Sequence, residues 1–152
     1  MEIVYLTGLP ASGKSTYRKT HFADYAVVSN DEITEELAEQ SGLSYDEAWK
    51  RLSFAEVYDA TLKRFNAAVA RRLNIVIDNT NLTRQARALY RAEGYGLKAV
   101  VFEIPENERR QREQTRKAAG GKYIPADVIE KMKRSYVPPS FDEGFSEIIR
   151  AQ

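Results

Sequence analysis

The stretch Gly8-Leu9-Pro10-Ala11-Ser12-Gly13-Lys14-Ser15 matches the pattern G-x-x-x-x-G-K-[ST] of a phosphate-binding loop. An apolar, β-branched run over residues 2–7 precedes it, and residues 15–19 can continue a helix. A strand, a glycine-rich loop and a helix are the setting that this motif requires. The alternative, a glycine-rich turn that binds nothing, does not explain this setting. The sequence therefore predicts a nucleoside triphosphate site at residues 8–16.

Each residue type in this loop has a physical role. Gly8 and Gly13 let the backbone approach a phosphate closely, so that successive N–H groups point inward. Lys14 is placed to reach the β- and γ-phosphates, the Ser15 hydroxyl is a suitable ligand for Mg²⁺, and Thr16 is expected to support the loop. We therefore expect ATP, or another nucleoside triphosphate, and Mg²⁺ to bind here.

Length and composition limit the remaining possibilities. The chain has 152 residues, of which 43% are hydrophobic and 30% charged, so we expect one globular domain over residues 1–152. It has no apolar run near 18 residues, and its first apolar stretch runs directly into the loop, which argues against a membrane span and a signal peptide. We expect a cytoplasmic protein without a membrane partner. There is no cysteine, and the net charge of +1 gives no general attraction to polyanions. The oligomeric state stays open.

The hydrophobic pattern predicts strands that alternate with helices. Strands are expected at residues 2–7, 25–29, 74–78, 97–104 and 145–150, and helices at 44–72, at 83–93 and after Pro125. Such alternation indicates an α/β fold with a central parallel sheet and helices on both faces, the three-layer sandwich of P-loop NTPases. Ligands of such folds bind at the carboxyl ends of the strands.

Asp31 follows the second expected strand directly, so its carboxylate could stand beside the γ-phosphate. A carboxylate within reach of an acceptor hydroxyl can orient it and accept its proton, which makes Asp31 our candidate general base. The alternative is structural. Ser29 and Glu32 have capping-box spacing, and an aspartate such as Asp31 is also favoured in the first turn of the next helix.

Four polar residues stand at the end of the third expected strand: Asp78, Asn79, Thr80 and Asn81. Asp78 has the Walker B position, where a carboxylate can hold Mg²⁺ directly or through water. The other three are suited to hydrogen-bond an acceptor or to order the loop around it. An Asx turn is the alternative for these residues.

The most basic stretch of the chain follows Pro105. On a helix, Arg109, Arg112 and Arg116 share one face, and arginine is well shaped for forked contacts to phosphate oxygens. Gly120 and Gly121 can end this helix and let it move, so residues 106–122 are predicted to form an arginine-bearing lid. The alternative is a solvated helix face whose arginines pair with neighbouring glutamates.

These residues together resemble the kinase domain of polynucleotide 5′-hydroxyl kinases of the bacteriophage and bacterial end-healing type. The resemblance rests on the phosphate loop, Asp31, residues 78–82, the lid arginines 112 and 116, and residues 124–125 and 138–145. It implies an ATP-dependent phosphotransferase that moves the γ-phosphate to the 5′-OH end of DNA or RNA in nucleic-acid repair. It also implies that Asp31 is the general base and that Arg112 and Arg116 contact the ATP phosphates. The chain has no Asp-x-Asp motif and no length for a phosphatase domain.

One position departs from that family. Members often carry an arginine three residues after the base, which grips the phosphate beside the acceptor sugar, and this chain has Thr34 there. Among the arginines that could replace the contact are Arg51, Arg64, Arg84 and Arg87. Four aromatic residues offer stacking surfaces for a base, although their near-helical spacing favours a place in the core: Tyr45, Trp49, Phe54 and Tyr58.

Two other functions use the same loop. A P-loop kinase of a small hydroxylated molecule, such as a nucleoside, a metabolite or an antibiotic, would need the same base, metal and lid. A nucleotide switch or mechanical ATPase would need no acceptor. The chain lacks an Asn-Lys-x-Asp guanine-reading motif and the length of such ATPases, which favours a kinase.

Overall fold

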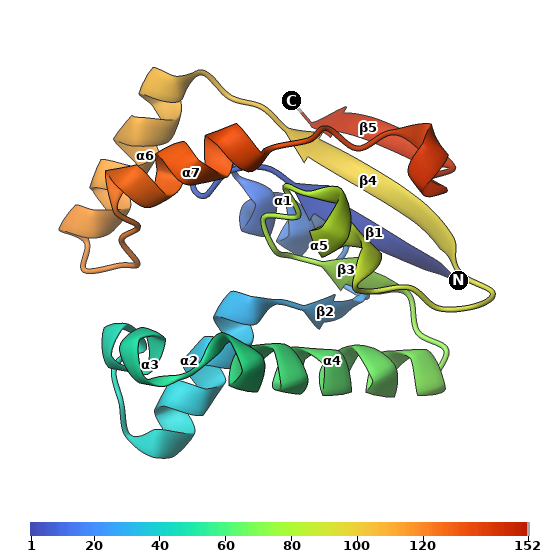
Figure 1. Cartoon of the computed structure of the whole chain (residues 1–152), viewed down its shortest axis with the longest axis horizontal. Helices are drawn as coiled ribbons and strands as arrows, with labels where there is room; N and C mark the ends of the chain where they lie inside the picture. Colours follow the sequence, from blue (N-terminus) through green and yellow to red (C-terminus); the bar gives the residue numbers. More distant parts are fainter. Residues whose placement is uncertain (152) are drawn as a thin grey trace.

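The structure, a computed structural model, describes residues 1–151 and is built on a parallel sheet of 5 strands in the order β2-β3-β1-β4-β5 (Figure 1). The strands are β1 (Glu2–Thr7), β2 (Ala26–Val28), β3 (Ile75–Ile77), β4 (Gly96–Phe102) and β5 (Glu147–Ala151). The predicted α/β class with a central parallel sheet is confirmed. In the strand order, β2 and β3 lie to one side of β1, and β4 and β5 lie to the other. The strand order therefore changes direction at β1, and α/β folds bind ligands at such a switch point.

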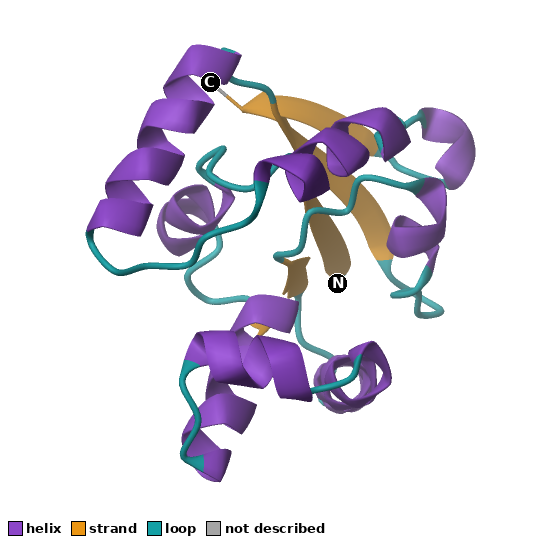
Figure 2. Cartoon of the chain, turned by 60° about the vertical axis from the view of Figure 1, so that its left-hand side comes forward, coloured by secondary structure: helices purple, strands orange, loops and turns teal. Residues whose placement is uncertain are grey.

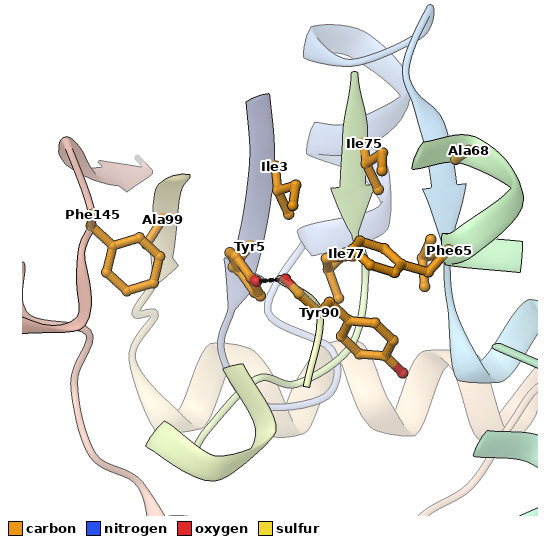
Figure 3. Packing of buried hydrophobic residues seen from close by; sticks show 10 residues of the cluster. Ile3, Tyr5, Phe65, Ala68, Ile75, Ile77, Tyr90, Ala99 and Phe145 are labelled. Atoms are coloured by element: carbon orange, nitrogen blue, oxygen red, sulfur yellow. Dashed lines mark hydrogen bonds between the residues drawn. The ribbon is translucent and has the colours of Figure 1, made fainter. Parts of the chain in front are cut away.

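Side chains from both faces of the sheet are buried, as the near-continuous apolar runs require. Ile3 and Tyr5 of β1 pack on one face with the cluster drawn in Figure 3, whereas Val4 and Leu6 pack on the other. Phe65 contributes to the first cluster and Tyr17 packs against the second. Successive side chains of a strand point to opposite faces, so one short segment supports both layers of helices.

Seven α-helices and a 3₁₀ turn join the strands of the described chain (Figures 1 and 2). They are α1 (Lys14–His21), α2 (Asn30–Ser41), α3 (Tyr45–Arg51), α4 (Phe54–Ala70), α5 (Arg84–Ala88), α6 (Glu106–Ala118), α7 (Ala126–Ser135) and η1 (Phe141–Glu143). None of the helices within residues 1–151 is long and apolar enough to cross a lipid bilayer.

The single helix predicted for residues 44–72 is wrong, because two helices with a break at Leu52 occupy this stretch. Ser44 caps α3 by accepting from Glu47 N–H, which is half of the predicted capping box, and Ser53 then forms a complete capping box with Glu56 and starts α4. A cap of this kind satisfies backbone N–H groups that a continuous helix would bond internally. The break turns the chain between two helices that both reach the site described below.

The helix predicted for residues 83–93 is also shorter than expected. Thr83 caps it, but α5 ends at Ala88. The chain leaves the helix so that Tyr90 enters the core, where its carbonyl accepts a hydrogen bond from the Tyr5 hydroxyl (Figure 3). Burial of an aromatic ring outweighs the small free energy of one more exposed helical turn.

Candidate active site

The loop of residues 8–13 leaves β1 at its carboxyl end and opens α1. A Cβ atom at Gly8 would lie 2.8 Å from the carbonyl oxygen of Phe102 and 2.9 Å from Ser12 Oγ, so no larger residue fits there without a shift. Gly13 has φ of +95°, in the left-handed region that favours glycine. These two positions explain both fixed glycines of the motif.

Lys14 is held inside this loop. Its Nζ donates to the carbonyl oxygens of Gly8 at 2.9 Å and Leu9 at 2.8 Å. Burial lowers the pKa of the Lys14 ammonium group to about 8, and the carboxylates of Asp78 and Asp31 oppose that decrease. A buried ammonium group without a carboxylate in direct contact is placed to gain from a phosphate ligand.

Ser15 and Asp78 form the hard-oxygen pair that the sequence predicts for Mg²⁺. Ser15 Oγ donates to Asp78 Oδ2 at 3.0 Å, and the Asp78 carboxylate is buried. Burial raises the pKa of Asp78, whereas Ser15 and the nearby Arg18 act in the opposite direction. Mg²⁺ commonly binds one or two protein oxygens together with phosphate oxygens and water, so these two residues fit it.

Asp31 lies in the first turn of α2 and also reaches the cleft. Ser29 caps α2 by accepting from Glu32 N–H at 3.3 Å, which is one half of the capping box that the spacing suggests, and the Glu32 carboxylate bonds Arg18 instead of closing the box. The Asp31 side chain stays half exposed, and it accepts hydrogen bonds from Lys122 Nζ at 2.6 Å and from the Tyr45 hydroxyl at 3.1 Å. A carboxylate has about four lone-pair sites, so each oxygen keeps one for an acceptor hydroxyl.

The residues after β3 divide between the site and the scaffold. Asn79 and Thr80 line the cleft, and Asn79 Oδ1 accepts from the backbone N–H of Asn30 at 2.8 Å. Asn81, which the sequence assigns to the acceptor, is instead 2% exposed. Its Nδ2 donates to the carbonyl oxygens of Leu6 and Ile77, so it ties β1 to β3 and does not line the cleft.

Helix α6, which the sequence predicts to be part of a lid, brings Arg112 and Arg116 to the cleft. Arg112 Nη1 lies 3.2 Å from the position that a Cβ would take at Gly13, directly above the phosphate loop. Within residues 1–151, the buried Nε of Arg116 has no hydrogen-bond partner. Arg109 has a different role, since it is buried and bonds Glu106 and Glu113. Arg112 also pairs with a glutamate, since its Nη2 lies 2.7 Å from Glu108 Oε1. The glutamate-paired alternative therefore applies to Arg109 and Arg112, and the lid stays a prediction.

One cleft of about 1530 Å³ collects most of these groups. Of the predicted site residues, Pro10 to Thr16, Asp31, Asp78, Asn79, Thr80, Arg112 and Arg116 line it. The volume exceeds what a small-molecule ligand alone needs and leaves room for two molecules side by side. A nucleotide on the loop and an acceptor beside Asp31 fit this arrangement.

Thr34, which stands where the resemblance to polynucleotide kinases would place an arginine, is buried, and its hydroxyl donates to the carbonyl oxygen of Asn30 at 2.8 Å. The suggested replacement arginines lie elsewhere. Arg64 pairs with Glu36, Arg84 with Asp142 and Arg87 with Glu143, and Arg51 is exposed outside the cleft lining.

Sequence reasoning missed two contacts of the site. Arg18 is buried, with Nε 3.1 Å from Asp78 Oδ2 and Nη2 2.7 Å from Glu32 Oε1, so it links the magnesium pair to α2. Its spacing of three residues from Ser15 on one helix was the available signal. Lys122, from the end of the lid, pairs with Asp31, and nothing in the local sequence indicates that long-range contact.

One family model and several solved structures are similar to this chain. The family model described as AAA domain matches residues 3–139. A sugar kinase from Janibacter sp. shares the fold with a TM-score of 0.66 and 16% identity, over 99% of this chain and 85% of that one. A Chaetomium thermophilum Kti12 structure in complex with ADP-AlF3 matches with a TM-score of 0.61 and 16% identity, over 98% of this chain and 88% of that one. A Sinorhizobium meliloti gluconokinase matches with a TM-score of 0.57 and 18% identity, over 98% of this chain and 81% of that one.

Proposed function

We infer that this chain, which belongs to the AAA domain family, is an ATP-dependent kinase that phosphorylates a hydroxyl group of a small molecule. The observation that carries the proposal is the placement of Lys14, Asp31 and the two lid arginines in the lining of one cleft. A phosphate loop alone would serve any nucleotide-binding protein, whereas a carboxylate beside it serves proton transfer from an acceptor. The solved structures with this fold include a sugar kinase and a gluconokinase, which supports a small acceptor.

The reaction follows from these positions. Lys14 and the N–H groups of the loop bind the triphosphate, and the Asp31 carboxylate orients the acceptor hydroxyl toward the γ-phosphorus. The hydroxyl oxygen forms the new bond to phosphorus while the bond between phosphorus and the β–γ bridging oxygen breaks. Asp31 accepts the hydroxyl proton, and the products are ADP and the phosphate ester. Arg112 and Arg116 stabilise the negative charge on the transferring group.

Ser15 and Asp78 would hold Mg²⁺, which neutralises charge on the β- and γ-phosphates when bound. Arg18 forms an ion pair with the Asp78 carboxylate, with Nε 3.1 Å from Oδ2. The Lys122 contact to Asp31 joins the end of the lid to α2 across the acceptor side of the cleft. Such a contact favours an acceptor small enough to be enclosed.

The 5′-OH of a nucleic acid is the second candidate acceptor. It is favoured by the presence in one cleft of Asp31, residues 78–80 and the lid arginines, which carry the resemblance to polynucleotide kinases. The buried Thr34 speaks against it, because the arginine that grips the neighbouring phosphate in that family is missing.

Transfer of labelled γ-phosphate from ATP and Mg²⁺ tests the proposal. The parallel acceptors are nucleosides, sugars, aminoglycosides, a short 5′-OH oligonucleotide and its 5′-phosphorylated copy, with Lys14→Ala as the inactive control. Label on a small molecule is the expected result. Label on the 5′-OH strand alone would establish the nucleic-acid end as the acceptor. Release of phosphate to water regardless of acceptor would contradict the kinase hypothesis.

Asp78→Asn should increase the Mg²⁺ concentration needed for half-maximal transfer by about 10- to 100-fold. The amide keeps the size of the side chain but removes the negative charge beside Ser15. The measurement is the transfer rate against Mg²⁺ at saturating ATP, with the exposed Asp24→Asn as the matched control. An unchanged Mg²⁺ requirement in the Asp78 variant would remove this residue from the metal site.

A further inference from the structure

One side of the cleft, which we call the acceptor wall, is formed by residues that α2, α3, α4 and their connections contribute. It consists of Asn30, Asp31, Thr34, Tyr45, Asp46, Trp49, Leu52, Ser53, Phe54 and Val57. Half of these residues are aromatic or aliphatic. The break between α3 and α4 creates the wall, because it places residues from both helices in the lining of the same cleft.

Two aromatic side chains of this wall, Trp49 and Phe54, are open to solvent, whereas Tyr45 is partly buried. Trp49 is 66% exposed and Phe54 is 76% exposed, so the expectation that they belong to the core is wrong. Tyr45 and Trp49 stand one helical turn apart on α3, with ring centroids 6.4 Å apart and an angle of 17° between the ring planes. Phe54 and Tyr58 form a similar pair on α4, with a centroid distance of 6.2 Å and an interplanar angle of 3°. Large exposed rings that line a cleft beside candidate catalytic groups are suited to cover a flat ligand.

The charge of the wall restricts that ligand further. Its charged residues are Asp31 and Asp46, and no lysine or arginine between residues 30 and 57 lines the cleft. The positive groups of the cleft lie on the loop and the lid, where Lys14 serves the triphosphate and Lys122 already pairs with Asp31. A negatively charged acceptor would thus meet carboxylates without a compensating donor on the wall, which opposes its binding.

We propose that the acceptor is a hydroxyl compound with a flat ring and no negative charge, whose ring lies against Trp49 and Phe54 while its hydroxyl faces Asp31. The statement about the hydroxyl rests on the proposed kinase function, whereas the ring and charge selectivity rest on the wall itself. Carboxylated sugars and nucleic-acid strands are excluded from this site by their charge. Nucleosides and aryl glycosides have the required chemistry.

Trp49 is the single tryptophan of the chain, so its fluorescence reports on the wall without any reaction. The titration uses the full chain with Mg²⁺ and a non-hydrolysable ATP analogue, and adds cytidine, phenyl glucoside, cytidine 3′-monophosphate or gluconate. We expect a saturable change with the first two compounds. Cytidine 3′-monophosphate has the same ring and the same 5′-OH as cytidine, and its negative charge should weaken binding at least about tenfold.

Phe54→Ala should weaken the binding of cytidine and phenyl glucoside about fivefold or more, since stacking of a base on an aromatic ring is lost. Phe54→Tyr, which keeps an aromatic ring, should bind both compounds with nearly the affinity of the wild type. Phe141→Ala is the matched control, because Phe141 is 66% exposed and lies outside the cleft lining. It should leave the titration unchanged.

The outcomes separate the two proposals. Absence of a saturable change with both uncharged compounds, equal or tighter binding of the 3′-monophosphate, or an unchanged affinity in Phe54→Ala would each overturn the selectivity. Ring-selective binding without phosphate transfer from ATP would contradict the proposed kinase function and support the selectivity of the acceptor wall. Phosphate transfer to gluconate or to a 5′-OH strand, at a rate that Phe54→Ala does not change, would support the kinase function and contradict the selectivity.

Discussion

Asp31→Ala should lower the rate of phosphate transfer by about two to four orders of magnitude while ATP still binds. The variant removes the carboxylate that faces the acceptor side of the cleft and leaves Lys14, Ser15 and Asp78 in place. The loss should therefore fall on kcat, measured with the acceptor found in the panel, and the affinity for ADP should change little by calorimetry. Asp31→Asn should show the same defect, because an amide keeps the shape but accepts no proton.

Asp59→Asn is the control for that experiment, since Asp59 is exposed on α4 and lies outside the cleft lining. It should transfer phosphate at the normal rate. Near-normal kcat in Asp31→Ala would contradict the assignment of the base. The carboxylate would then be left with its other visible role, the contacts to Lys122 and Tyr45 that connect the lid to α2 and α3.

The phosphate loop and its place in the sheet could be predicted because the signal is local. Residues 2–16 contain the strand, both glycines and the start of the helix, and each residue type has a steric or electrostatic reason to be there. Strand positions followed from apolar runs buried on both faces. Asp78 followed from its place at the end of such a run.

The remaining site depends on contacts between segments far apart in the chain. Asn81 and Asn79 have the same chemistry, but only the fold shows that Asn81 bonds the carbonyl oxygens of β1 and β3. The end of α3 at Arg51 depends on the capping box at Ser53, which competes with a continuous helical pattern. Trp49 is 66% exposed, whereas helical spacing alone predicted a place in the core.

Arg87 is another residue whose role depends on contacts between distant segments. The sequence offers it as an acceptor contact, whereas its side chain is fully buried. It donates two hydrogen bonds to Glu143, at 2.8 and 3.0 Å, and two more to the carbonyl oxygens of Asn81 and Val137. It thereby attaches the segment before β5 to α5 and to the end of β3.

Arg87→Met should lower the free energy of unfolding by about 3–5 kcal/mol, because it leaves the buried Glu143 carboxylate without its partner. The double variant Arg87→Met, Glu143→Met should lose less than the single one, since it removes both charges. Arg84→Met breaks the exposed pair with Asp142 and should leave the urea midpoint almost unchanged, which makes it the surface control.

The effect of Arg87→Met on the free energy of unfolding should depend on pH, because Arg87 controls the pKa of Glu143. In the wild type, burial raises the pKa of Glu143, but the bonds from Arg87 and the Ser140 backbone outweigh it, and the pKa is lowered. The pair therefore stabilises the fold above the ordinary pKa of glutamate, and this stabilisation is lost as the pH falls through the lowered value. Without Arg87, burial dominates and the carboxyl group favours its neutral form. Urea unfolding should thus show that Arg87→Met loses less free energy of unfolding, relative to the wild type, at pH 5 than at pH 7. An equal loss at both pH values would contradict the buried ion pair as its cause.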